Sequence, residues 1–191
     1  SDLSMDMKTM LCSFGSANQA LFAVAVSQMA RFYGLTSMSN AGLTDALMPD
    51  FQGGIEKGIT ACFNFLSGGR SMGAMGIVGA DQGISLEQLV LDNEWIEYYN
   101  YIVRGFEVSE DTIGLEAIAE AGIKGNYLDL DHTFEYWRDS YLQSNIFLRD
   151  NFANWTSHSK PELLDRAHDF VEKATAGYEQ REPVIPAAVC D

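Results

Sequence analysis

The sequence predicts an α/β fold in which short strands alternate with long helices. Three times between residues 8 and 105, an apolar or β-prone run leads through a glycine-containing turn into a helical pattern. Such regular alternation is typical of a parallel sheet with helical crossovers. After Glu107 the alternation stops and mostly helical patterns follow. We therefore expect three βα units followed by a helical tail.

The first unit begins with a predicted strand over residues 8–13, which Gly15 separates from a helix. Ser16 and Gln19 have the spacing of a capping box, in which each side chain satisfies a backbone amide of the other residue. Gly34 ends the predicted helix. Its apolar residues recur at helical spacing and are Leu21, Phe22, Ala25, Met29 and Phe32.

The second unit combines a strand over residues 35–39, a polar loop over residues 40–45, and a helix. Pro49 is well placed as the first helical residue, and the glycines at 68 and 69 stop the helix. Glycines inside a helix cost about 1 kcal/mol each relative to alanine. This helix contains Gly53, Gly54 and Gly58, which indicates that another element approaches its backbone closely.

The third unit starts with a strand over residues 71–78 that is rich in methionine and glycine. A turn over residues 79–83 leads to a second capping-box pattern at Ser85 and Gln88. The helix that follows continues to Arg104 and is closed by Gly105. The glycines of this strand allow either a flat cofactor or tight packing against the backbone.

The composition is that of a globular protein, with 47% hydrophobic and 20% charged residues in a chain of 191. The formal net charge of -15 argues against nucleic acid as a partner, and it provides either solubility or an acidic docking face. Cys12, Cys62 and Cys190 show no paired spacing, which fits a reducing cytoplasm. No apolar run is long enough to span a bilayer, and the first residues do not resemble a signal peptide.

A series of short motifs, in order along residues 5–175, resembles the trimethylamine methyltransferase family. The clearest are Gln28-Met29-Ala30-Arg31-Phe32-Tyr33-Gly34-Leu35, Thr44-Asp45, Pro49-Asp50, Glu56-Lys57, Ser85-Leu86-Glu87-Gln88-Leu89, Arg104-Gly105-Phe106-Glu107-Val108 and Asn126-Tyr127-Leu128. Single motifs are unspecific, whereas the ordered set is fairly specific. The family's chains are much longer, so the resemblance covers only their C-terminal part.

The resemblance implies the C-terminal portion of a (β/α)8 TIM-type barrel followed by a helical tail. Residues 1–108 would supply the last βα units of the barrel, residues 109–180 a helical C-terminal cap, and residues 181–191 an extended tail. Groups that bind substrate in such barrels project from the C-terminal ends of the strands and from the loops after them.

The resemblance also implies a corrinoid-dependent amine methyltransferase. Such an enzyme moves a methyl group from trimethylamine, or from a quaternary amine such as glycine betaine, to a cognate corrinoid protein. The corrinoid (cobalamin) would be carried by that partner and not by this chain, and the protein would be a homo-oligomer. The fragment alone would be inactive. The sequence leaves open which amine is the substrate and whether the native protein contains pyrrolysine.

The candidate substrate-binding residues lie in the loops after the first two predicted strands. Asp45 is the first choice to face a cationic amine, with Thr44, Asp50 and Gln52 beside it. Phe14 would form part of an aromatic wall. Asn18 stands at a helix start that often carries an acid in the family. The structural alternatives are a turn or helix cap for Asp45, a first-turn position for Gln52, and core packing for Phe14.

Two other functions remain open at this stage. The chain could be a non-catalytic half-barrel module for assembly or binding, which would pair its exposed strand edges with another chain. It could also be a different (β/α) enzyme that binds phosphate or a metal. No dinucleotide fingerprint, phosphate loop or closely spaced metal ligands support the last alternative, and His132 is expected to cap or stitch a helix.

Overall fold

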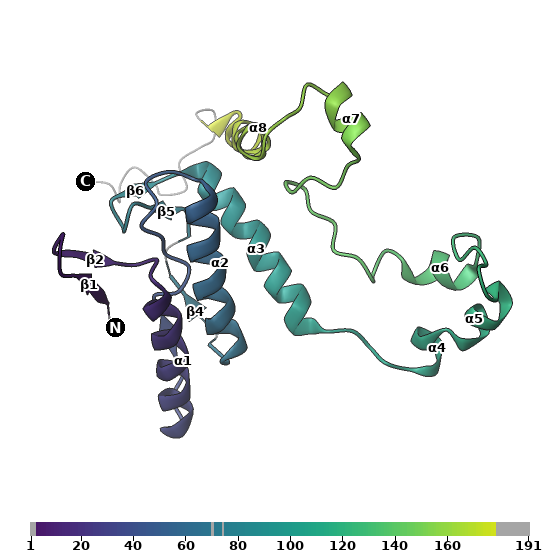
Figure 1. The fold of residues 1–191 in the computed structure, drawn as a ribbon, viewed down its shortest axis with the longest axis horizontal. Helices are drawn as coiled ribbons and strands as arrows, with labels where there is room; N and C mark the ends of the chain where they lie inside the picture. Colours follow the sequence, from purple (N-terminus) through teal and green to yellow (C-terminus); the bar gives the residue numbers. More distant parts are fainter. Residues whose placement is uncertain (1–2, 70, 74, 179–191) are drawn as a thin grey trace, which may run out of the picture. The chain divides into compact units, whose positions relative to one another are not determined.

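The computed structural model describes residues 3–69, 71–73 and 75–178 and is a mixed α/β structure with small sheets (Figure 1). Its contacts divide the chain into two compact units. The first unit combines residues 1–93 with residues 150–191, and the second contains residues 94–149. The predicted extended tail at residues 181–191 lies outside the described residues. Among the described residues, no helix is both long and apolar enough to cross a membrane.

The first unit opens with an antiparallel hairpin of β1 (Ser4–Asp6) and β2 (Leu11–Ser13). The Asp6 carboxylate accepts hydrogen bonds from the Lys8 amide and the Thr9 hydroxyl, both at 2.9 Å, and so turns the chain back. The strand predicted at residues 8–13 is therefore confirmed only for its last three residues. Its partner is the strand just before it in the sequence.

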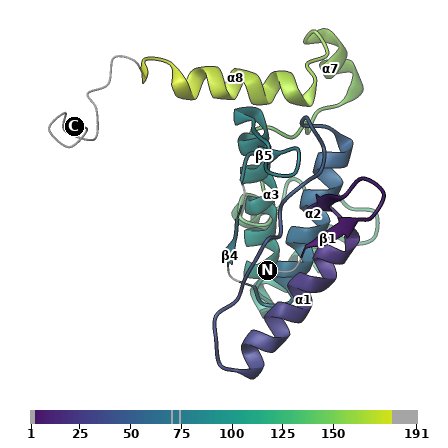
Figure 2. The same cartoon turned by 90° about the vertical axis from the view of Figure 1, so that its left-hand side faces the viewer.

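Two helices of the first unit, α1 (Ala17–Phe32) and α2 (Phe51–Leu66), lie side by side in both views (Figures 1 and 2). The buried face of α1 consists of small or polar side chains: Gln19, Ala20, Ala23 and Ser27. The buried face of α2 is similar and consists of Gly53, Lys57, Thr60, Ala61 and Asn64. Small side chains let the two helices approach closely, and the polar ones require partners within the interior.

The prediction of one parallel sheet built from three βα units is wrong for the described residues, which form three separate two-stranded sheets. One pair is parallel, because β3 (Met38–Ser39) and β4 (Ser71–Met72) flank α2 as a βαβ unit. The run predicted at residues 71–78 divides into β4 and β5 (Ile77–Val78). The turn after β5 folds it back onto β6 (Gly83–Ile84) as an antiparallel hairpin. A TIM-type barrel therefore remains a prediction.

Helix α2 begins at Phe51, two residues after the start predicted at Pro49. Asp50 is the N-cap, and its carboxylate accepts the Gly53 amide at 2.9 Å. Pro49 lies outside the helix, so its prediction as the first helical residue is wrong. The close approach predicted from the helical glycines is found at Gly53, where an added Cβ would touch Met48, Ala46 and Gln88 at ordinary distances, but not at Gly54.

The two predicted capping boxes have different outcomes. Ser16 forms no side-chain cap on α1, and Ser16 Oγ and Gln19 Oε1 are buried without a hydrogen-bond partner. Ser85 does cover the Gln88 amide at 3.1 Å at the start of α3 (Leu86–Arg104). The Gln88 side chain does not return to the cap, since it donates to Asp92 instead. The predicted ends of both helices near Gly34 and Gly105 are confirmed.

The second unit contains three short helices, α4 (Glu110–Ile113), α5 (Leu115–Ala121) and α6 (Asp131–Tyr136). Gly114 separates α4 from α5 with a left-handed conformation, φ 65°. His132 Nε2 donates to the Asp111 carbonyl at 2.7 Å, which joins α6 to α4 as expected for a stitching histidine. The first unit resumes with α7 (Phe152–Ser157) and α8 (Leu163–Thr175).

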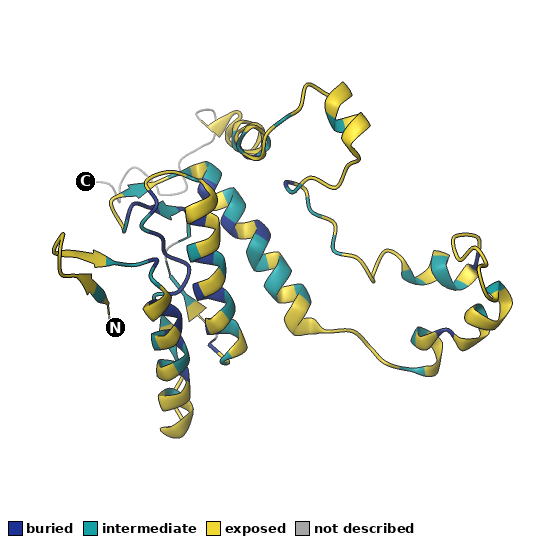
Figure 3. Ribbon diagram, in the orientation of Figure 1, coloured by how far each residue is buried: buried dark blue, intermediate teal, exposed yellow. Residues whose placement is uncertain are grey.

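Buried residues of the first unit gather in the loop between β3 and α2 and on the facing sides of the helices (Figure 3). Residues 41–44 of this loop are all buried. The opposite face of α2 carries an exposed apolar stripe of Phe51, Ile55, Ile59, Phe63 and Leu66. Helix α2 therefore buries polar side chains and exposes apolar ones.

Candidate functional site

The loop after β3 carries Asp45, whose carboxylate is held by the chain that enters α1. Ser13 donates its hydroxyl to this carboxylate at 2.7 Å, and the amides of Phe14 and Gly15 donate at 2.8 and 3.2 Å. Three donors of this kind hold the carboxylate in one orientation. Asp45 therefore fixes a turn, which is the structural role considered for it as an alternative to substrate binding. Its carboxylate also lies beside Phe14.

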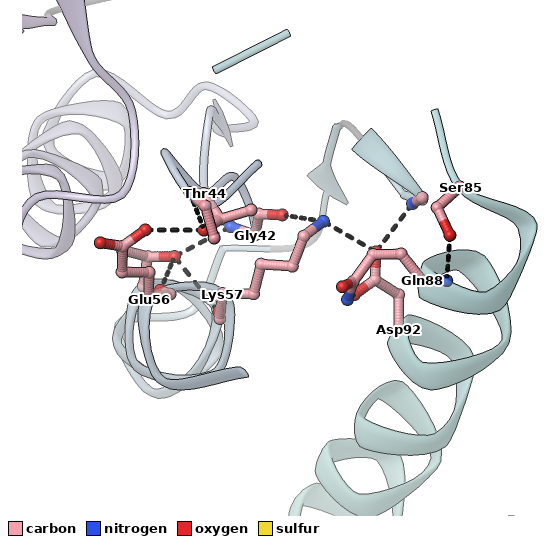
Figure 4. Close-up of polar contacts among 10 residues, drawn as sticks. Gly42, Thr44, Glu56, Lys57, Ser85, Gln88 and Asp92 are labelled. Carbon is pink, nitrogen blue, oxygen red and sulfur yellow. Dashed lines mark hydrogen bonds and ion pairs between the residues drawn. The ribbon is translucent and has the colours of Figure 1, made fainter. Parts of the chain in front are cut away.

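Glu56 of α2 holds the same loop from the other side (Figure 4). Its Oε2 accepts the Thr44 hydroxyl at 2.7 Å and the Asp45 amide at 2.9 Å. Its Oε1 accepts the Gln52 side-chain amide at 2.9 Å. The carboxylate of Glu56 thus brings together three of the predicted site residues, Thr44, Asp45 and Gln52.

The next residue of α2, Lys57, forms a completely buried ion pair with Asp92 of α3. Lys57 Nζ lies 2.8 Å from Asp92 Oδ2, and both side chains have 0% exposure. Lys57 also donates to the Gly42 carbonyl at 3.0 Å. Burial lowers the pKa of Lys57, and the nearby charge of Asp92 and its hydrogen bond oppose that effect.

Asp92 also holds a second loop. Its Oδ2 accepts the Gly76 amide at 2.7 Å, and its Oδ1 accepts the Gln88 side chain at 2.7 Å. Gly76 has φ 74° and lies against α3, where an added Cβ would approach Leu89 and Ser85 at 3.1 and 3.2 Å. The glycines of this strand were expected to admit either a flat cofactor or tight packing. Gly76 packs tightly against the start of α3.

A cavity of about 540 Å³ opens between the first hairpin and the two loops. It is lined by Asp6, Thr9, Leu11, Cys12, Ser13, Phe14, Asp45, Leu47, Gly79, Ala80, Asp81 and Gln82. Three carboxylates therefore border it, together with one aromatic ring and two leucines. Hydrogen bonds from Lys8 and Thr9 lower the pKa of Asp6, which keeps that carboxylate ionised.

The rim of this cavity includes an unusual run of backbone conformations. Gly79, Ala80 and Asp81 are consecutive and have φ 62°, 55° and 83°. Non-glycine residues seldom adopt this left-handed region, and they do so where the surrounding structure imposes it. Here the amides of Gly79 and Ala80 donate to the carbonyls of Ala46 and Thr44 at 2.6 and 2.9 Å.

The six candidate residues occupy different places. Asp45 and Phe14 line the cavity. Thr44 is completely buried and is not among the residues lining the cavity. The remaining three are not among the residues that line it: Gln52 is exposed and held by Glu56, Asp50 caps α2, and Asn18 is exposed on the first turn of α1.

Five acidic or basic residues of this region were not among the candidates: Asp6, Glu56, Lys57, Asp81 and Asp92. For Lys57, the spacing of residues along the helix could have indicated its role. Lys57 falls on the same helical face as Gly53, Thr60, Ala61 and Asn64, a small and polar stripe that predicts a buried amine. Such an amine requires a carboxylate partner. No pattern in the sequence identifies Asp92 as that partner.

Among the residues that the structure describes, no three His, Cys, Asp or Glu side chains gather closely enough to hold a metal ion. Cys12 is exposed at the cavity and Cys62 is half-buried in α2, and both are free thiols. Cys190 lies outside the described residues.

Comparison with known proteins identifies relatives that match most of the chain. The family model described as trimethylamine methyltransferase (MTTB) matches residues 2–191. Trimethylamine methyltransferase MttB of Methanosarcina barkeri is 33% identical over 173 residues, which cover 90% of this chain and 34% of the relative. Trimethylamine methyltransferase MttB of Desulfitobacterium hafniense is 27% identical over 86% of this chain and 33% of the relative.

A second kind of relative differs in its named substrate. Glycine betaine methyltransferase of Desulfitobacterium hafniense is 29% identical over 174 residues, which cover 91% of this chain and 36% of the relative. The chain spans about a third of the length of the curated relatives it matches. Because the family model covers nearly every residue, the chain belongs to the trimethylamine methyltransferase family.

Proposed function

We propose that this chain is part of a cytoplasmic methyltransferase that moves a methyl group from a methylated amine to a cognate corrinoid protein. Trimethylamine and quaternary amines such as glycine betaine are the substrate class. Membership of the family and the names of the relatives support methyl transfer from these amines. Because the chain spans about a third of those relatives, we expect it to be inactive by itself.

The observation that carries the proposal for this chain is the composition of the cavity. A methylated ammonium ion binds against aromatic faces and near carboxylates, because its charge is spread over apolar methyl groups. The cavity offers Phe14 and the carboxylates of Asp45 and Asp81, beside the apolar side chains of Leu11 and Leu47. We expect the ammonium group to bind between Phe14 and these carboxylates.

The change in charge during methyl transfer determines whether these carboxylates affect substrate binding or the rate. A corrinoid carried by the partner protein would supply the nucleophile for the methyl carbon. The carbon–nitrogen bond breaks and its electron pair stays on nitrogen, so a quaternary amine loses its positive charge. Carboxylates therefore stabilise the bound substrate more than the product amine. Asp45 and Asp81 should lower the KM of a quaternary amine without raising kcat.

The test uses the native protein expressed from its complete gene, together with its corrinoid protein. Each methylated amine is supplied in turn, and the demethylated amine is quantified by proton NMR. The variant Asp81→Asn should raise KM about tenfold, the effect of one lost charge contact in a partly shielded site, with kcat nearly unchanged. Asp169→Asn on the exposed face of α8 removes the same charge outside the cavity and serves as the matched control.

Absence of any demethylated amine from the native protein and its corrinoid partner would overturn the proposed reaction. Equal KM values for Asp81→Asn and Asp169→Asn would instead remove this cavity as the amine site and leave the reaction standing.

A second candidate function is a non-catalytic module for assembly, and the exposed apolar stripe of α2 favours it. Apolar stripes of this kind mark surfaces that pair with other protein. The purified 191-residue chain, measured by light scattering, would form a dimer or larger assembly if the stripe drives self-association. A chain that stays folded and monomeric would count against this candidate.

A further inference from the structure

Two loops form one wall of the cavity and are joined directly to each other. The first, residues 40–47, carries Asp45, and the second, residues 76–82, carries Asp81. The amides of Gly79 and Ala80 donate to carbonyls of the first loop. Backbone hydrogen bonds of this kind fix the spacing of the two carboxylates only if each loop is itself held in place.

The buried ion pair of Lys57 and Asp92, drawn in Figure 4, contacts both loops. Lys57 donates to the Gly42 carbonyl of the first loop, and Asp92 accepts the Gly76 amide of the second. Neither Lys57 nor Asp92 lines the cavity. The pair is therefore a bridge between the two loops.

Helix α2 delivers two consecutive charged side chains to the first loop. Glu56 accepts the Asp45 amide, and Lys57 reaches the carbonyl of Gly42 on the other side of the same loop. The Gly42 amide in turn donates to the Thr60 hydroxyl at 3.0 Å. The loop is thus fixed at its start by Lys57 and Thr60 and at Asp45 by Glu56.

We propose that the Lys57–Asp92 pair is a positioning unit that sets the separation of Asp45 and Asp81 across the cavity wall. Its consequence for amine binding rests on the proposed function. The alternative is a pair that only stabilises the fold. Buried ion pairs are weak contributors to stability, and apolar replacements of similar shape are often tolerated. A replacement of that type separates the two roles.

The first test is hydrogen exchange on the full 191-residue chain without any substrate. The double variant Lys57→Met/Asp92→Leu keeps the buried volume but cannot hold Gly42 or Gly76. The amides of Asp45, Gly79 and Ala80 should exchange at least about tenfold faster than in the unchanged protein, the effect of losing one charge-assisted hydrogen bond. Amides inside α1 should keep their protection.

The variant Asp92→Asn is the conservative rescue. Its amide oxygen can still accept from Gly76 and from Lys57, and Gln88 can reverse its side-chain amide to face the new nitrogen. We expect protection of the two loops to return to within about threefold of the unchanged protein, because the acceptor rather than its charge holds Gly76. His168→Gln breaks an exposed ion pair of the same unit and should leave both loops unaffected.

Wild-type exchange at Asp45, Gly79 and Ala80 in the double variant would overturn the proposal, and so would equal exchange in Asp92→Asn and the double variant. If the double variant fails to fold, Asp92→Asn and Lys57→Arg decide by the same measurement, since Lys57→Arg keeps the charge but displaces the donor from Gly42.

The second test measures KM and kcat for the methylated amine in the native protein with the same substitutions. The double variant should raise KM about tenfold with kcat nearly unchanged, the split expected when only the placement of binding groups is lost. An unchanged KM would overturn the link between the pair and the amine site. If the native protein demethylates no amine, the proposed function fails, and the hydrogen-exchange result still decides the positioning role.

Discussion

The carboxylate of Glu56 occupies the space that a side chain at residue 15 would need. An added Cβ on Gly15 would overlap Oε2 and Cδ of Glu56 and would lie 3.0 Å from its Cβ. The same Oε2 accepts the Thr44 hydroxyl and the Asp45 amide. A methyl group at residue 15 must therefore displace the carboxylate that holds the candidate site together.

We predict that Gly15→Ala lowers the free energy of unfolding by about 1–3 kcal/mol, the usual cost of overpacking an interior. It should also weaken amine binding by the native protein, because the displaced Glu56 no longer holds Asp45. Urea unfolding measures the first effect and calorimetric titration with a quaternary amine the second.

Gly54→Ala is the matched control for that substitution. Nothing lies within 4 Å of a Cβ added at Gly54, and the residue is exposed on α2. Alanine there should raise the free energy of unfolding by up to about 1 kcal/mol, because glycine is a poor residue inside a helix. Changes of the same sign at Gly15 and Gly54 would contradict the packing explanation for Gly15.

We predict that Asp50→Ala costs about 1 kcal/mol of stability, because it removes the N-cap of α2. Asp50→Ser keeps an acceptor for the Gly53 amide and should be nearly neutral in urea unfolding. Neither variant should change the KM of the native protein beyond the effect of its stability. A raised KM in Asp50→Ser, with the cap intact, would support Asp50 as a substrate contact.

Helices were predictable from this sequence because each carries its own local signals. The helices ending near Gly34 and Gly105 were found from apolar spacing and a closing glycine. Strand pairing was less predictable, because a strand of two or three residues has no pattern that specifies its partner. Asp6 decides the partner of β2 by turning the chain at Lys8, a local hydrogen bond that the apolar pattern does not show.

The candidate site, like the fold, was predictable only in part. Asp45 and Phe14 were selected as loop residues after a strand, and both lie at the cavity, although their contact with an amine remains a prediction. Asp50 and Gln52 were selected by the same reasoning. In the fold Asp50 caps α2 and Gln52 donates to Glu56, and their contact with an amine also remains a prediction. Polar loop residues perform both tasks, and only the fold distinguishes them.

We predict that Lys57→Met destabilises the chain by about 3–5 kcal/mol, because it leaves the Asp92 carboxylate buried without its cation. The double variant Lys57→Met/Asp92→Leu should recover most of this loss, since no unpaired charge then remains in the interior. Urea unfolding of both variants beside the unchanged chain checks the difference. Equal losses of unfolding free energy in the single and double variants would show that the unpaired Asp92 charge does not cause the destabilisation.

The contact between α8 and the start of α3 should depend on pH. His168 Nδ1 lies 3.0 Å from Glu87 Oε1, and Glu172 lies 3.6 Å from the other ring nitrogen. The hydrogen bond to Glu87 raises the pKa of His168 above its ordinary 6.5. The hydrogen bond from His168 lowers the pKa of Glu87 below its ordinary 4.5.

Each of the two pKa shifts limits the pH range in which the ion pair stabilises the fold. Stabilisation by His168 is fully present below pH 6.5 and is lost as the pH rises through its raised pKa. Stabilisation by Glu87 is fully present above pH 4.5 and is lost as the pH falls through its lowered pKa. The difference in Tm between the unchanged chain and His168→Gln should therefore be largest between pH 4.5 and 6.5 and shrink on both sides. A difference that stays constant from pH 4 to pH 9, in steps of about one unit, would show that the pair does not titrate as a unit in the folded chain.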